Sequence, residues 1–66
     1  MSEVAYRSRV SVVRERGPLR WATLPAEDAP VAFGVHSAVA EHYGVAPEDS
    51  PPHATTLDYV VAAVAG

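Results

Sequence analysis

The sequence predicts an α+β fold in which a three-stranded antiparallel sheet is followed by a buried helix, in the order β-β-β-α. Two stretches alternate between apolar and polar residues, a Gly-Pro turn signal follows the first strand, and the last stretch has apolar residues at helical spacing. We expect strands at about 4–13, 19–24 and 31–39 and a helix at about 56–66, in a single partial domain covering 1–66.

The first two strands are expected to form a hairpin. Gly17-Pro18 is a turn signal, and the connection is short enough for antiparallel pairing. In the second strand, Leu19 and Trp21 would point to one face. The first strand would place four apolar side chains on one face: Val4, Tyr6, Val10 and Val12.

The stretch 31–39 has two interpretations. Its alternation predicts a third strand, with Val31, Phe33, Val35 and Val39 on one side. The alternative is a short helix from Ala38 to Tyr43, which Ser37 would cap at its start and Gly44 at its end.

The final stretch predicts a helix with a defined start. Thr55 and Asp58 have the spacing of a capping box, in which a hydroxyl and a carboxylate satisfy free N–H groups of the first turn. An apolar stripe follows, and small apolar residues occupy most of the other side, so we expect burial against the sheet. The stripe consists of Leu57, Val60, Val61 and Val64.

Composition limits the function. The 66 residues contain no cysteine, which excludes disulfides and thiol chemistry within them. A net charge of −3 argues against a nucleic-acid partner. No apolar run approaches the ~20 residues that span a bilayer, and the start lacks a secretory signal, so we expect no membrane association and a cytoplasmic location.

No residue pattern defines a catalytic, cofactor or metal site. The three histidines, His36, His42 and His53, lack metal-site spacing, and no G-x-S-x-G elbow supports a hydrolase. The adjacent pair Glu41 and His42 is interpreted as ordinary surface residues. Ser50, which precedes two prolines, is interpreted as a loop residue. An anion-binding hairpin remains a further hypothesis, formed by Arg14, Arg16 and Arg20 beside Trp21. Asp58 is the most informative acid, although its capping role alone accounts for it.

The strands, the proline-rich approach and T-L-D-Y-V-V-A-A-V-A-G together resemble the OsmC/Ohr family, osmotically inducible protein C and organic hydroperoxide resistance proteins. In that family a similar segment forms the long central helix. The resemblance implies an intertwined homodimer that reduces organic hydroperoxides with two cysteines, assisted by an Arg and a Glu. It places the family's acid at Asp58, and its first cysteine immediately after Gly66.

Because these residues lack cysteine, they are expected to be inactive by themselves. They would form the N-terminal portion of an OsmC-like, peroxidase-like protein of oxidative stress defence. None of the arginines matches the family's catalytic Arg. The alternative is a small non-catalytic β-β-β-α module that acts in dimerisation or interaction.

Overall fold

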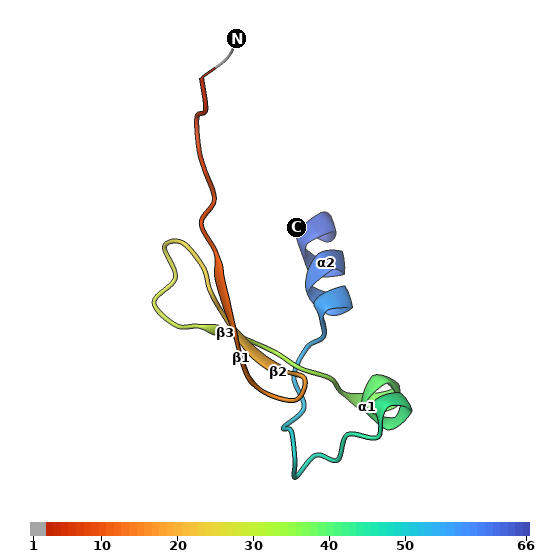
Figure 1. The fold of residues 1–66 in the computed structure, drawn as a ribbon. Coiled ribbons are helices and arrows are strands. Elements are labelled where there is room, and N and C mark those ends of the chain that lie inside the picture. The colour runs from red at the N-terminus through yellow and green to blue at the C-terminus, as the bar shows by residue number, and fades with distance from the viewer. Residues whose placement is uncertain (1–2) are drawn as a thin grey trace.

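The computed structural model describes residues 3–66 as a three-stranded sheet with two helices (Figure 1). The strands are β1 (Ser11–Arg16), β2 (Leu19–Thr23) and β3 (Val31–Phe33), and the helices are α1 (Ser37–Tyr43) and α2 (Thr56–Ala65). Neighbouring strands follow the chain order and run antiparallel. The predicted α+β class with an antiparallel sheet is confirmed.

The β1–β2 hairpin turns at Gly17 and Pro18, as predicted. Gly17 has a φ of 50°, a left-handed conformation that glycine adopts without steric cost. Arg16 pairs with Leu19 and Arg14 pairs with Arg20, so one residue of β1 is left over as a bulge. The turn therefore fixes the register of the whole hairpin.

The first strand is shorter than expected and lies further along the chain. Residues 3–10 are outside any strand, and β1 starts at Ser11, so the predicted range 4–13 is wrong in its first part. Ser11 pairs with Thr23, the last residue of β2, and Pro25 soon follows, which has no N–H for a ladder. The alternation of apolar and polar residues before Ser11 does not form a strand, because β2 has no further residues to pair with it.

The third strand ends at Phe33, so the predicted range 31–39 is wrong beyond that residue. The alternative helix is correct: α1 runs from Ser37 to Tyr43 and ends at Gly44, whose φ of 68° forms a left-handed cap. Ser37 itself has a φ of 50°, which breaks the extended backbone. The N-cap position is taken by His36, without a capping side-chain bond, whereas Ser37 was the predicted cap.

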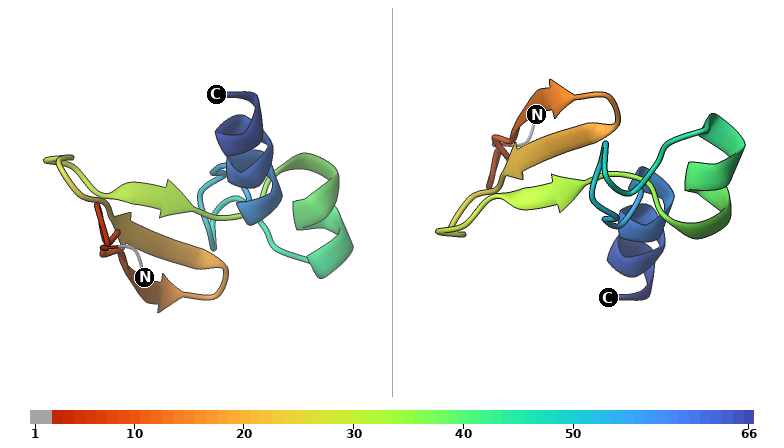
Figure 2. Two further views of the ribbon diagram at one scale, coloured as in Figure 1. Left: turned by 90° about the horizontal axis from the view of Figure 1, so that it is seen from above. Right: turned by 90° about the horizontal axis from the view of Figure 1, so that it is seen from below.

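Backbone hydrogen bonds place the approach to α2 beside the end of β3. The Gly34 N–H donates to the Ala54 carbonyl at 2.9 Å, and the His53 N–H donates to the Val35 carbonyl at 3.4 Å. Gly34 allows this approach because a Cβ there would lie 3.1 Å from the His53 Cβ. Both helices consequently lie beyond the carboxyl end of β3 and leave much of the sheet uncovered (Figure 2).

The expected burial of the final helix is wrong for the chain by itself, since α2 has no buried residue. It reaches the sheet through Tyr59, whose ring lies 4.3 Å from that of Phe33 and whose hydroxyl donates to the Ala32 carbonyl at 2.6 Å. The apolar stripe faces away from these contacts, with Leu57 69% and Val64 83% exposed. In the described residues, the buried core hydrophobics are Leu19 and Ala22.

Candidate functional site

Asp58 occupies the first turn of α2 and forms the predicted capping box. Its backbone N–H donates to Thr55 Oγ1 at 3.2 Å, and its Oδ2 accepts the Thr55 N–H at 3.0 Å. These two bonds satisfy N–H groups that have no partner within the helix. The capping prediction is confirmed.

The structure adds a partner that the sequence did not reveal. His36, from the connection between β3 and α1, places its Nε2 2.7 Å from Asp58 Oδ2. Its Nδ1 lies 3.1 Å from the hydroxyl of Ser37. Because an ionised carboxylate only accepts, Nε2 carries the proton, and in the neutral ring Nδ1 accepts from Ser37.

The pKa of Asp58 is lowered from its ordinary value. The hydrogen bond from the Thr55 backbone is the largest cause, and the His36 side chain adds to it. Both interactions favour the ionised carboxylate. The His36 and Asp58 side chains remain 39% and 45% exposed, so solvent weakens their attraction. The three residues Ser37, His36 and Asp58 therefore form an exposed clasp between the β3–α1 connection and α2.

Ser37, His36 and Asp58 are hydrogen-bonded in series, as the serine, histidine and aspartate of a hydrolase triad are, but their geometry differs from that of a triad. Ser37 directly follows His36 in the chain and contacts Nδ1, and both serine and carboxylate are exposed. A general base works best on a nucleophile held beside a site that excludes water. The clasp accordingly orients two segments rather than activating the serine.

The remaining histidines do not join this cluster. The ring centres of His53 and Trp21 lie 6.2 Å apart in an edge-to-face arrangement, and those of His42 and Tyr43 lie 5.0 Å apart. Within residues 3–66, no group of three potential ligands could hold a metal ion. Glu41 and His42 lie on α1, where adjacent side chains project in different directions.

Two members of the proposed anion-binding hairpin, Arg20 and Trp21, have partners within the chain. Arg20 donates to the Pro18 carbonyl at 3.1 Å and to Thr56 Oγ1 at 3.3 Å, and its guanidinium carbon lies 5.4 Å from the centre of the Phe33 ring. Trp21 Nε1 donates to the Glu15 carboxylate at 3.0 Å, so this donor already has a partner within the chain. Arg20 thus joins the sheet to the first turn of α2, a role that sequence reasoning missed because these contacts are far apart in the chain.

Several large apolar side chains of α2 and β1 are exposed. On α2 the stripe of Leu57, Val60, Val61 and Val64 is at least half exposed, and Val12 and Val13 of β1 are exposed as well. Burial of such side chains contributes roughly 1.5–3 kcal/mol each. We call the four α2 residues the apolar stripe.

The comparisons with known proteins found no matching family model, no matching curated protein and no matching solved structure. Within the part of the chain that the structure describes, neither helix has the length and apolar character needed to cross a membrane.

Proposed function

We propose that this chain is an assembly element of an OsmC-like homodimer, in which the apolar stripe of α2 is covered by a second polypeptide surface. The observation that carries the proposal is the exposure of this stripe on a helix whose start is fixed firmly. A contiguous exposed apolar surface is typical of an interaction site. The resemblance to the OsmC/Ohr family supplies the expected partner, a second copy.

In this proposal the chain contributes the sheet and the start of the central helix, and the thiols come from polypeptide outside these 66 residues. The complete activity would be thiol-dependent reduction of organic hydroperoxides. A thiolate attacks one peroxide oxygen, and the O–O bond breaks with release of an alcohol, which leaves a sulfenic acid. A second thiol then attacks the sulfenic sulfur, the S–O bond breaks, and a disulfide and water are formed. Asp58 would act as the family's acid. The cytoplasm, which keeps thiols reduced, is the proposed location.

The oligomeric state tests the assembly part of the proposal. Light scattering coupled to size-exclusion chromatography should give twice the mass of the chain. Val61→Glu, in the stripe, should shift the protein to the monomer because it places a charge in the apolar interface. Ala62→Glu, which is exposed on the same helix but outside the stripe, should leave the dimer intact. A monomeric wild-type chain would contradict the proposal.

The catalytic part needs a separate test. The intact mass and thiol count of the polypeptide from its native source should show two thiols, and that polypeptide should consume an organic hydroperoxide. A dimer with no thiols and no consumption would instead identify the non-catalytic interaction module.

A further inference from the structure

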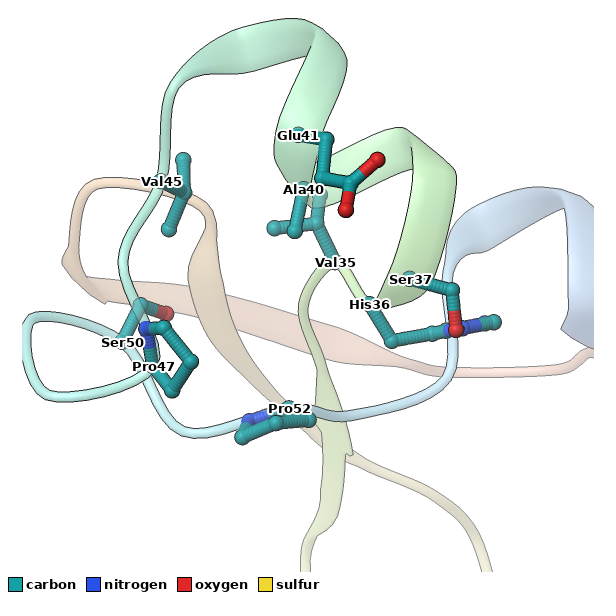
Figure 3. A pocket seen from close by; sticks show the side chains of 9 residues that line it. All are labelled: Val35, His36, Ser37, Ala40, Glu41, Val45, Pro47, Ser50 and Pro52. Carbon is teal, nitrogen blue, oxygen red and sulfur yellow. The ribbon is translucent and has the colours of Figure 1, made fainter.

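A cavity of about 250 Å³ lies beside α1. Figure 3 shows that α1, the connection after β3 and the loop 45–52 contribute its walls. A protein cavity of ~150 Å³ can already hold benzene. This cavity therefore has room for a ligand of several non-hydrogen atoms.

Ser50 gives the cavity an unpaired polar group. The residue is only 4% exposed, and its hydroxyl has no hydrogen-bond partner among the described residues. Its backbone N–H is already satisfied by the Ala46 carbonyl at 3.1 Å. A buried hydroxyl without a partner is costly and uncommon. The hydroxyl of Ser50 therefore points to a ligand with a hydrogen-bonding group at this wall.

Glu41 supplies a charge from a different wall. It extends from α1, whereas Ser50 belongs to the loop 45–52 (Figure 3). Its carboxylate forms no ion pair or side-chain hydrogen bond within residues 3–66. The other two polar lining residues, His36 and Ser37, are already bonded in the clasp. Glu41 and Ser50 are thus the groups left to bind a ligand.

The rest of the lining is apolar, and it includes no lysine or arginine. Its apolar members are Val35, Ala40, Val45, Pro47 and Pro52. Apolar walls with a small number of fixed polar groups are typical of small-molecule sites. A carboxylate without a neighbouring cation favours a positively charged ligand.

We propose that this cavity binds a small aliphatic amine with a polar group at its far end. The ammonium pairs with Glu41, the carbon chain contacts the apolar walls, and the distal hydroxyl exchanges a hydrogen bond with Ser50. This inference does not depend on the OsmC-like function.

An NMR titration of the ¹⁵N-labelled chain tests the proposal with 5-aminopentan-1-ol. We expect saturable shifts of the amides of α1 and residues 45–52, with a dissociation constant in the millimolar range. Pentylamine, which lacks the hydroxyl, and pentan-1-ol, which lacks the charge, should each bind about tenfold more weakly. Absence of saturation would overturn the proposal.

Variants of Ser50 and Glu41 test which residue binds the hydroxyl and which binds the ammonium of the ligand. Ser50→Ala should weaken binding of the amino alcohol about tenfold without changing binding of pentylamine. Glu41→Gln should weaken both amines. Glu48→Gln, which removes a nearby acid that does not line the cavity, is the matched control and should change neither. Amide spectra of each variant check that it is folded. Equal affinities of all folded variants for the amino alcohol would show that neither group binds it, and the proposal would be wrong.

Discussion

His36 Nε2 lies 2.7 Å from Asp58 Oδ2, and the same oxygen accepts the backbone N–H of Thr55 at 3.0 Å. One carboxylate oxygen therefore joins two segments that are 22 residues apart. The start of α2 is fixed relative to the end of β3, although the rest of the helix has few contacts with the sheet.

The Thr55 hydroxyl should contribute measurably to the stability of α2. We expect Thr55→Ala to lower the free energy of unfolding by ~1 kcal/mol, because the Asp58 N–H loses its acceptor. Urea unfolding followed by circular dichroism measures the change. Thr55→Ser keeps a hydroxyl at the cap and should recover most of the loss; if both variants are equally destabilised, the hydroxyl bond is not the cause.

Stability should fall in acid through Asp58. Its pKa is lower in the folded chain than in the unfolded chain, so the folded state releases this proton more readily. The contribution is complete above the ordinary carboxyl pKa, about 3.9, and is lost as the pH falls through the lowered value. Urea unfolding at several pH values should show that wild type exceeds Asp58→Asn by more at pH 6 than at pH 2. A constant difference would contradict this.

Gly44 should tolerate few replacements. Its φ of 68° is unfavourable for residues with a Cβ, so Gly44→Ala should cost ~1 kcal/mol, although nothing lies within 4 Å of a Cβ built there. Gly44→Asn should cost less because asparagine adopts this conformation more readily. Thermal unfolding of the two variants distinguishes backbone strain from a general loss of packing, which would affect Asn at least as much as Ala.

The Tyr59 hydroxyl should stabilise the contact between α2 and the sheet. Tyr59→Phe removes the bond to the Ala32 carbonyl, which is partly buried, and we expect a loss of ~1 kcal/mol in urea unfolding. Tyr43→Phe removes a hydroxyl from a side chain that is 70% exposed and should have little effect. Equal effects of the two variants would show that the Ala32 bond contributes nothing specific.

Local signals predicted the elements that depend on neighbouring residues. Gly17-Pro18 is sufficient to define the hairpin turn, and Thr55 with Asp58 is sufficient to define the start of α2. Both depend on contacts within four residues. The cap at Gly44 was also visible, although alternation from Val31 onward favoured the strand.

The features that could not be predicted from the sequence depend on contacts between residues far apart in the chain. The limit of β1 at Ser11 depends on where β2 ends, and the pairing of His36 with Asp58 depends on how the chain returns after α1. Ser50 lies in a loop, as the two prolines after it predict, but its burial was not predicted. No pattern within the loop reveals that its hydroxyl is enclosed.

The backbone bond from Gly34 to Ala54 has a consequence for variation of the chain. It brings the two ends of the segment 35–53, which includes α1, next to each other, so that this segment forms a closed loop. The sheet and α2 are positioned by residues at the two ends of this segment, among them His36, whose ring bonds Asp58, and not by α1. Because loop closure costs only about 0.6 kcal/mol for each doubling of length, insertions near its tip should leave the placement of α2 unchanged. The segment around α1 is therefore the part of this fold that can lengthen or diverge while the rest keeps its geometry.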